Sequence, residues 1–437
     1  MKTADVLIGG ATIGTLEARQ NSLLGFRYCD DYRHNHDATP LSVSMPLSAA
    51  HHSDSAVTPY FWGLLPDDQQ VIRRWSQEYQ ISPSNLFGLL CNIGDDLPGG
   101  IRIVSPDRAE TAGEEPVEWI GVEGVEERLA TLRNDPAAWA GRPAAGRWSL
   151  PGAQAKIALL HDNGQWGVPT GNIPTNRILK PAIPGLAEHD LNEHLCLSAM
   201  RQLGLQAAAS EVITFGSERA IVVTRYDRYQ DRYGAWRRVH QEDLCQALGL
   251  HPSAKYESDG GPGASDIVKL LRAVMASRLA ERAVSDFLRA LVFNWVIVGT
   301  DAHAKNYSLL LSGRDVRLAP FYDVGSALPY STFIPKEKLA MKIGHDYRMS
   351  HVHGRAWRQL AERCGVDEDR MRAIIDSVLG FIANAFAEVG QSDSVRSLDS
   401  SLPDRLTALI AENVEHCRVS LRSWDTPTTV DGSGRYD

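Results

Sequence analysis

Three polar side chains between residues 301 and 323 have the types and the order that phosphoryl transfer requires. Asn306 follows Asp301 by five residues, and Asp323 follows after two short runs of strand-forming residues. Protein kinases use an aspartate to accept the proton of the attacking hydroxyl, and they use an asparagine and a second aspartate to hold magnesium. The spacing therefore predicts Asp301 as the catalytic base and Asn306 and Asp323 as Mg²⁺ ligands.

The elements around these residues are those that would bring them together. An apolar helix over residues 283–298 ends at Gly299, and the loop TDAHAKN carries Asp301 and Asn306. The runs YSLLL and VRLAP flank the polar turn SGRD, which predicts a hairpin that returns the chain to Asp323. Taken singly, the three residues also fit a helix end, an Asx-turn and a turn after a strand. Their joint order favours the kinase interpretation.

A kinase also needs a cation beside the phosphates and a loop over the nucleotide. Lys180 ends the run RILK, and a helix predicted at residues 187–203 carries Glu193. This arrangement resembles the strand lysine and helix glutamate of protein kinases, although a solvated lysine is the alternative. The run SLPGAQAK at residues 149–156 lacks the pattern G-x-G-x-x-G. From its pattern alone it is a surface turn, whose backbone N–H groups could contact phosphates.

The chain changes character along its length in a way that predicts an α+β protein. Residues 1–110 are rich in strand and turn signals. Residues 111–240 continue with short strands, among which Asn163-Gly164 predicts a type I′ hairpin turn. Residues 241–421 are mainly helical, including the run QEDLCQALGL, and the polar tail 422–437 is expected to be disordered. A strand-rich lobe beside a helix-rich lobe leaves a cleft for a ligand.

Composition limits the classes of protein to which the chain can belong. It has 437 residues, a net charge of −9 and a pI near 5.9, so it is too acidic to bind nucleic acid by itself. Binding to DNA within a complex stays open. The six cysteines form no C-x-x-C pair, which argues against a disulfide framework and a zinc site. We find no run of about 18 apolar residues and no signal peptide, and so expect a cytoplasmic protein that does not bind membranes.

The segment 225–238 contains five arginines interleaved with tyrosines, which would suit contact with RNA or with a protein substrate. Asp227 and Asp231 interrupt this run. We therefore expect a solvent-exposed hairpin whose arginines pair with nearby acids.

Several longer runs closely resemble the HipA family of bacterial toxin kinases. They are SLPGAQAK, RILKP, NEH, QEDLCQALGL, KYESDGGPG, TDAHAKN and APFYD, in this order from about residue 145 to residue 330. The strands near the N-terminus and the run FWGLLPD resemble the small first domain of that family. The resemblance implies a two-lobed, protein-kinase-like fold. It would have a β-rich N-terminal domain at residues 1–110, an N-lobe at 111–240 and a helical C-lobe at 241–421.

The resemblance also implies roles for single residues, and it agrees with Asp301 as the base and with Asn306 and Asp323 as Mg²⁺ ligands. The positions that would contact ATP are Pro151, Gly152, Ala153, Gln154, Ala155, Lys156, Lys180, Thr224, Arg225, Tyr226, His303, Ala304, Lys305, Asn306, Tyr322 and Asp323. Thr224 to Tyr226 would form the hinge that faces the adenine. We also expect Lys305 to balance charge on the γ-phosphate. Pro151 and Thr224 depart from the family pattern, which puts the loop and adenine contacts in doubt.

Ser149 matches the serine that HipA-like kinases autophosphorylate. A phosphate of about −1.5 to −2 charge would expel the loop from the site and stop ATP binding.

The activity that the resemblance implies is phosphorylation of serine or threonine, with ATP and Mg²⁺ as cofactors. The substrate would be an aminoacyl-tRNA synthetase of the glutamyl type, whose inhibition arrests translation and produces persistence. The partner would be a HipB-like helix-turn-helix antitoxin, which carries the kinase onto operator DNA. Two alternatives stay open: a small-molecule phosphotransferase with the same Asp/Asn/Asp core, and a catalytically inactive co-repressor module.

Overall fold

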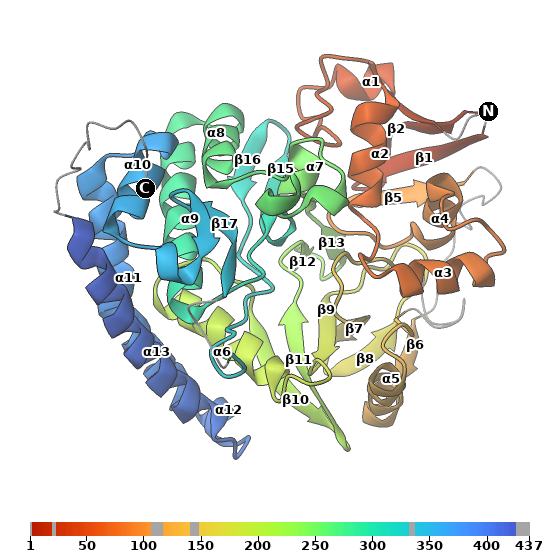
Figure 1. Ribbon diagram of the computed structural model, residues 1–437. Coiled ribbons are helices and arrows are strands. Elements are labelled where there is room, and N and C mark those ends of the chain that lie inside the picture. Colours follow the sequence, from red (N-terminus) through yellow and green to blue (C-terminus); the bar gives the residue numbers. More distant parts are fainter. Residues whose placement is uncertain (1, 20–22, 106–116, 140–147, 332–336, 425–437) are drawn as a thin grey trace.

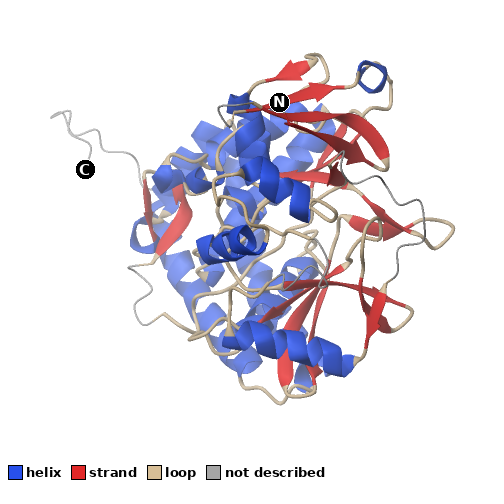
Figure 2. Cartoon of the chain, turned by 90° about the vertical axis from the view of Figure 1, so that its right-hand side faces the viewer, coloured by secondary structure: helices blue, strands red, loops and turns tan. Residues whose placement is uncertain are grey.

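The computed structural model describes residues 2–19, 23–105, 117–139, 148–331 and 337–424. In Figure 1 the strands of the first half of the chain lie on one side of the molecule, and the long helices α9, α11 and α13 lie on the other. In Figure 2 one group of strands lies beside the N-terminus and another lies at the opposite end of the molecule, with smaller ribbons elsewhere. This is the α+β arrangement expected from the sequence. Most of the polar tail, residues 425–437, lies outside the described residues.

The first sheet is antiparallel and has the order β4-β3-β2-β1-β5. Gly9 and Gly10 connect β1 to β2 with φ values of 59° and 86°, a left-handed conformation that glycine adopts without steric cost. The strands of this sheet and the helices beside it are β1 (Lys2–Ile8), β2 (Ala11–Ala18), β3 (Leu24–Tyr28), β4 (His51–His52), β5 (Ile101–Val104), α1 (Asp30–Arg33), α2 (Asp54–Trp62), α3 (Gln69–Glu78) and α4 (Leu86–Ile93).

The second sheet has the order β10-β11-β9-β7-β8-β6. Asn163 and Gly164, with φ values of 48° and 78°, turn the chain between β7 and β8, which confirms the predicted hairpin. The elements of this region are β6 (Glu118–Ile120), β7 (Ile157–Asp162), β8 (Gln165–Val168), β9 (Arg177–Pro181), β10 (Ser210–Phe215), β11 (Glu218–Thr224), α5 (Val122–Asn134) and α6 (His189–Gln202).

A third sheet, in the order β14-β15-β16, supports the predicted catalytic loop. Its strands are β14 (His240–Asp243), β15 (Ser308–Ser312) and β16 (Asp315–Leu318), and a two-stranded ribbon of β12 (Arg228–Gln230) and β13 (Trp236–Arg238) precedes it. The hairpin predicted before Asp323 is therefore β15–β16. The run QEDLCQALGL is only partly helical, contrary to expectation. Its first residues pair with β15 as a strand, and α7 (Leu244–Ala247) begins after them.

The remaining C-terminal region is helical apart from one further ribbon. Its elements are α8 (Ala264–Val274), α9 (Ser277–Ile297), β17 (Lys338–Ile343), β18 (Asp346–Arg348), α10 (Gly354–Cys364), α11 (Glu368–Gly390), α12 (Asp393–Arg396) and α13 (Leu402–Ser420), with short 3-10 turns such as η3 (Glu257–Asp259), η4 (Ala304–Asn306) and η7 (Leu421–Trp424).

Two hydrophobic cores meet along β9. One core joins the first and second sheets, so that Val6, Phe61 and Val222 belong to the same cluster. The other core fills the helical half around Phe287, Trp295 and Trp357. Because Ile178 of β9 packs against both cores, β9 lies at the junction of the two halves.

Among the described residues, one helix, α11, is long and apolar enough by length and composition to cross a membrane. Half of that apolar window is buried in the protein, where α11 packs against α6, α9 and α13. Helices in the core of a globular protein can have the same length and apolar composition, so these properties of α11 are weak evidence for a membrane span.

The prediction that the hairpin at residues 225–238 is exposed to solvent is wrong for three of its arginines. Arg225 and Arg228 are buried, and the side chain of Arg238 is only 9% exposed. The three guanidinium groups lie 2.8–3.2 Å from carboxylate oxygens of Asp96 and Asp227. Burial would raise the pKa of Asp96, but the three arginines outweigh it and hold the pKa well below its usual value. Asp96 follows α4, so the buried ion network fastens the N-terminal region to the second sheet.

Candidate active site

Asp301 and Asn306 lie in the loop that follows α9. The helix ends at Val298, whose φ of 55° is left-handed, and a Cβ on Gly299 would lie 2.4 Å from Oδ1 of Asn294. A side chain at residue 299 would therefore require Asn294 to move. The Nδ2 of Asn306 donates to the backbone oxygen of Asp301 at 2.8 Å, which holds the two residues in one arrangement. The Asp301 side chain is 66% exposed and so accessible to an acceptor hydroxyl.

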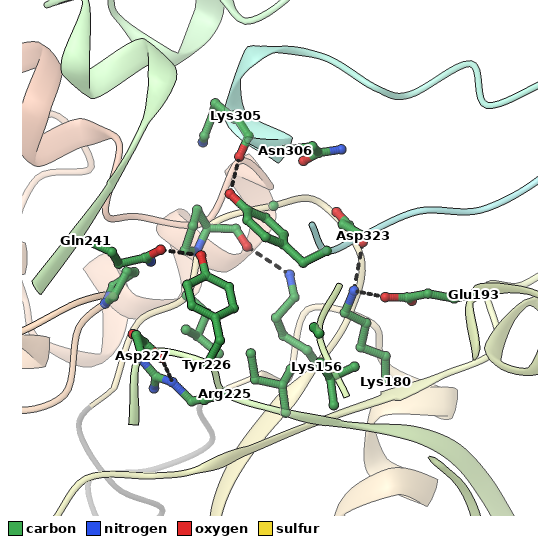
Figure 3. A pocket seen from close by; sticks show the side chains of 18 of the residues that line it. Lys156, Lys180, Glu193, Arg225, Tyr226, Asp227, Gln241, Lys305, Asn306 and Asp323 are labelled. Atoms are coloured by element: carbon green, nitrogen blue, oxygen red, sulfur yellow. Dashed lines mark hydrogen bonds and ion pairs between the residues drawn. The ribbon is translucent and has the colours of Figure 1, made fainter. Parts of the chain in front are cut away.

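Asp323 and Lys180 meet between the two halves of the protein. Asp323 follows β16 with a left-handed φ of 57°, and Lys180 lies in β9. The Nζ of Lys180 is 2.7 Å from Oδ1 of Asp323 and 2.8 Å from Oε1 of Glu193 in α6, as the dashed lines of Figure 3 show. The pairing of a strand lysine with a helix glutamate, which the sequence left open, is therefore present.

These ion pairs fix the charge of both partners. Burial by itself would lower the pKa of Lys180, but Asp323 and Glu193 outweigh it and raise the pKa above its ordinary value. Burial would raise the pKa of Asp323, but Lys180 outweighs it and holds the pKa well below the usual range. Both groups are charged at neutral pH. The second carboxylate oxygen of Glu193, Oε2, is buried and has no hydrogen-bond partner among the described residues.

A cavity between the 149–156 loop, β9 and the catalytic loop has both apolar and charged walls. Its apolar lining comes from Ile178, Ala208, Val223 and Tyr226. The ring of Tyr226 lies 5.7 Å from that of Tyr322, and its hydroxyl donates to Oε1 of Gln241 (Figure 3). Its charged lining includes Lys156, Lys180, Lys305 and Asp323. A flat base with a polyphosphate tail requires this combination of walls.

Lys156 is the cation of the 149–156 loop. Its Nζ donates to the backbone oxygen of Pro151 at 3.0 Å and lies 4.1 Å from the centre of the Trp139 ring. Burial, and then repulsion from Lys180, lowers the pKa of Lys156 to about 7. The charge of this lysine therefore changes close to neutral pH, at the wall of the cavity.

An open cleft of about 630 Å³ adjoins this smaller cavity of about 110 Å³. The two share part of their walls, including Asn306 and Asp323. Asp301 lines the open cleft and is not among the residues that line the first cavity. Asp301, Asn306 and Asp323 thus face one common space, as the spacing predicts. A nucleotide in the first cavity would place its terminal phosphate at the shared wall, opposite an acceptor group beside Asp301.

Asn306 and Asp323 fit a Mg²⁺ ion that phosphates also hold. Within the described part of the chain, no cluster of three His, Cys, Asp or Glu side chains could hold a metal ion. Mg²⁺ usually takes one or two carboxylates together with phosphate oxygens and water, rather than a complete set of protein ligands. One amide oxygen and one ionised carboxylate at the shared wall match that requirement.

The residues predicted to contact ATP are divided between the two spaces. The first cavity is lined by Pro151, Gly152, Lys156, Lys180, Thr224, Arg225, Tyr226, His303, Lys305, Asn306, Tyr322 and Asp323. Ala153, Gln154 and Ala155 line the open cleft instead. The guanidinium of Arg225 is held in the buried ion network. Ala304 belongs to the helical core and lines neither space, so the expected nucleotide contact fails for its side chain.

Ser149 is fully buried at the start of the loop. Its hydroxyl donates to the backbone oxygen of Leu64 at 2.7 Å, and its N–H donates to the backbone oxygen of Asp96 at 3.0 Å. In this arrangement the hydroxyl cannot reach a phosphate donor, so phosphorylation of Ser149 requires the loop to leave its place.

Three residues of the site were not predicted, although they lie in runs that carry the family resemblance. The carboxylate of Asp67, in FWGLLPD, pairs with Lys305 and with Lys255 of KYESDGGPG. The hydroxyl of Tyr256 donates to Oδ1 of Asp301. Burial, and then this hydrogen bond, raises the pKa of Tyr256, so the tyrosine remains a donor. No spacing rule could identify these contacts, because Asp67 is 238 residues from Lys305.

Comparison with known families and proteins agrees with this geometry. Residues 4–104 match the HipA N-terminal domain, and residues 148–386 match the HipA-like C-terminal domain. The relative named "Putative kinase Y4mE", from Sinorhizobium fredii, is 32% identical, over 96% of this chain and 100% of its own length. The serine/threonine-protein kinase toxin HipA of Shewanella oneidensis is 26% identical, over 89% of each chain.

Among solved structures, the complex of HipA, HipB and operator DNA from Shewanella oneidensis matches with a TM-score of 0.82 and 23% identity. The match covers 97% of this chain and 99% of that one. It confirms the two-lobed, kinase-like fold, and the names of the relatives confirm the predicted enzyme class, a kinase. Because the two domain matches cover most of the sequence in the expected order, the chain belongs to the HipA family.

Proposed function

We propose that this chain is an ATP-dependent serine/threonine protein kinase and the toxin of a toxin–antitoxin pair. The observation that carries the proposal is the shared wall at Asn306 and Asp323, with the lysine-lined cavity on one side and Asp301 on the other. An acceptor alcohol and a terminal phosphate can meet only at such a wall. The name of the Shewanella oneidensis relative supports the finer part of the proposal.

The side chains divide the work of phosphoryl transfer between them. Lys180 and Lys156 bind the phosphates of ATP, and Asp301 accepts the proton of the serine or threonine hydroxyl as the oxygen attacks the γ-phosphorus. The bond between the γ-phosphorus and the oxygen that bridges it to the β-phosphate breaks, and ADP leaves with that oxygen. Lys305 offsets charge on the γ-phosphate. Mg²⁺, held by Asn306 and Asp323, would neutralise the charge that develops on the phosphate oxygens. The contribution of the protein is therefore position and electrostatics.

The substrate and partner that we propose come from the family resemblance. The substrate is an aminoacyl-tRNA synthetase, of the glutamyl type, and its inhibition leads to arrest of translation in the cytoplasm. The partner is a HipB-like helix-turn-helix antitoxin that brings the chain to operator DNA. The net charge of −9 supports a basic partner as the DNA-binding component, because an acidic chain lacks the excess of Lys and Arg that would neutralise the phosphates along a DNA duplex.

The burial of Ser149 supports self-inactivation at this residue. The hydroxyl now donates to the backbone oxygen of Leu64, whereas a phosphate of about −1.5 to −2 charge can only accept hydrogen bonds and would be repelled by that oxygen, so the modified loop could not return. Pro151, Gly152 and Lys156 would then no longer line the nucleotide cavity.

Incubation of the pure chain with labelled ATP and Mg²⁺ tests the proposed function. We expect a single labelled serine, Ser149, detected by mass spectrometry, and no label in Ser149→Ala. The Ser149→Ala variant should still phosphorylate glutamyl-tRNA synthetase, and should do so for longer than the wild type. Label on a small metabolite, with none on protein, would identify a small-molecule phosphotransferase. A chain that consumes no ATP would be an inactive co-repressor module.

The affinity for MgATP should fall as the pH rises through about 7. Lys156 has a lowered pKa of about 7, so it is mostly charged near pH 6 and mostly neutral near pH 8. We expect the Kd to rise roughly tenfold over that range, and binding near pH 8 to take up about one proton. Calorimetry in buffers of different ionisation enthalpy measures both quantities. Lys156→Met should bind MgATP weakly at every pH, and an unchanged pH dependence in this variant would contradict the assignment.

A further inference from the structure

Asp67 is an acidic residue of the N-terminal domain that reaches the nucleotide cavity. It lies between α2 and α3, at the end of the run FWGLLPD, and it lines the same cavity as Lys180 and Asp323. Neither the mechanism proposed above nor the spacing of the kinase residues gives it a role.

The carboxylate of Asp67 is shared by two lysines from separate segments of the kinase. One oxygen pairs with Nζ of Lys305, and the other lies 2.8 Å from Nζ of Lys255. The three side chains are 16%, 3% and 19% exposed, respectively, so the cluster is nearly removed from water. Burial would raise the pKa of Asp67, but Lys305 and Lys255 outweigh it and lower the pKa. The carboxylate is therefore ionised and fixes two ammonium groups.

The backbone of the same turn holds the 149–156 loop. The N–H of Asp67 donates to the backbone oxygen of Gly152 at 3.0 Å, and the backbone oxygen of Leu64 accepts from the Ser149 hydroxyl at 2.7 Å. Residues 64–67 therefore contact both the start and the middle of the loop that borders the phosphates.

Lys255 continues the connection to the catalytic base. Its backbone oxygen accepts from the N–H of Ala304 at 3.1 Å, within the catalytic loop. The next residue, Tyr256, donates its hydroxyl to Asp301. The Asp67 carboxylate thus contacts the catalytic loop through Lys305 and the segment beside the catalytic base through Lys255, while the backbone of the same turn holds the 149–156 loop.

We propose that Asp67 is a positioning residue for the kinase reaction, supplied by the N-terminal domain. It holds Lys305 in the orientation that meets the γ-phosphate, and it keeps the KYESDGGPG segment against the catalytic loop. Without the carboxylate, the two buried ammonium groups repel each other and Lys305 has no fixed place. This inference rests on the proposed kinase function. It predicts that loss of the Asp67 carboxylate lowers kcat more than it changes KM, because Lys180 and Lys156 still bind the phosphates of ATP.

The test is the single-turnover autophosphorylation of Asp67→Asn, which keeps the shape and the backbone hydrogen bond and removes the charge. Because the label on Ser149 ends the reaction, kcat here is the maximal rate constant of labelling, and KM is the MgATP concentration that gives half of it. We expect kcat to fall by roughly 10–100-fold, with KM for MgATP changed by less than about threefold. Asp68→Asn is the matched control. Asp68 accepts a hydrogen bond from the N–H of Gln70 as the N-cap of α3, a role that asparagine also fills, and its kinetics should match the wild type.

A double-mutant cycle with Lys305→Met separates positioning from a general effect on folding. If Asp67 acts through Lys305, Asp67→Asn should lower the kcat of the Lys305→Met variant by no more than about twofold. A structural defect would instead lower kcat by the same factor in the wild-type and Lys305→Met backgrounds. A wild-type kcat in Asp67→Asn, an increase in kcat, or an undiminished effect in the Lys305→Met background would each overturn the inference. A wild-type chain that transfers no phosphate would instead contradict the proposed function.

Discussion

Asp301→Asn should lower the rate of phosphoryl transfer by about a thousandfold, while the Kd for MgATP stays within about twofold of the wild-type value. Asparagine has nearly the same shape as aspartate but cannot accept the proton of the attacking hydroxyl. Asp301 lines the open cleft rather than the nucleotide cavity, so its charge contributes little to ATP binding. Single-turnover labelling with ATP measures the rate, and calorimetry measures the affinity.

The control for this prediction is Asp315→Asn. Asp315 is exposed at the start of β16, on the hairpin that joins the catalytic loop to Asp323, so the variant loses a carboxylate close in sequence but remote in function. Its rate should equal that of the wild type. A rate within tenfold of the wild type in Asp301→Asn would contradict the assignment of Asp301 as the base.

The parts of this site that could be predicted from sequence are those held by short segments. Asp301 and Asn306 share one loop, and the β15–β16 hairpin fixes the path from that loop to Asp323. The order of these residues along the chain therefore encodes their position in space. Lys180 and Glu193 are 13 residues apart, on a strand and on the helix that follows it, so this pair also has a local origin.

The parts that could not be predicted depend on contacts between distant segments. Asp67 meets Lys305 only because the N-terminal domain packs against the catalytic loop, and nothing in the local pattern of FWGLLPD indicates that contact. The arginines of segment 225–238 were predicted to be exposed to solvent, because their partner Asp96 lies about 130 residues earlier and is not visible in the local pattern. The start of QEDLCQALGL forms a strand because it pairs with β15, and this pairing overrides a helix-like pattern.

Lys180→Met should have the second large effect, because it removes a cation that two carboxylates share. We expect kcat/KM for MgATP to fall by about 10²–10³-fold, since the phosphates lose a fixed positive charge. Glu193 is 1% exposed and would be left as a buried charge without a partner. Breaking such a pair costs about 3–5 kcal/mol when both groups are buried. Asp323 is 35% exposed, so we expect the free energy of unfolding to fall by about 2–3 kcal/mol.

The loss of stability in Lys180→Met should depend on pH, in a direction that follows from Glu193. Without its cation, the buried carboxylate loses the partner that offsets its removal from water, and this cost is borne only while the group is ionised. The folded variant should therefore lose stability as the pH rises and the carboxylate becomes ionised. In urea denaturation, the free energy of unfolding of Lys180→Met should therefore be close to the wild-type value near pH 4. Near pH 8 it should be lower by the whole expected amount.

The double variant Lys180→Met/Glu193→Gln separates this stability effect from the chemistry. Glutamine removes the uncompensated charge, so most of the lost stability should return near pH 8, because a buried polar group costs less than a buried ion. Activity should not return, since the phosphates still lack their lysine. A Lys180→Met chain as stable as the wild type at every pH would contradict the role of Lys180 as the shared charge partner. Restored transfer in the double variant would show that another cation, such as Lys156, can bind the phosphates alone.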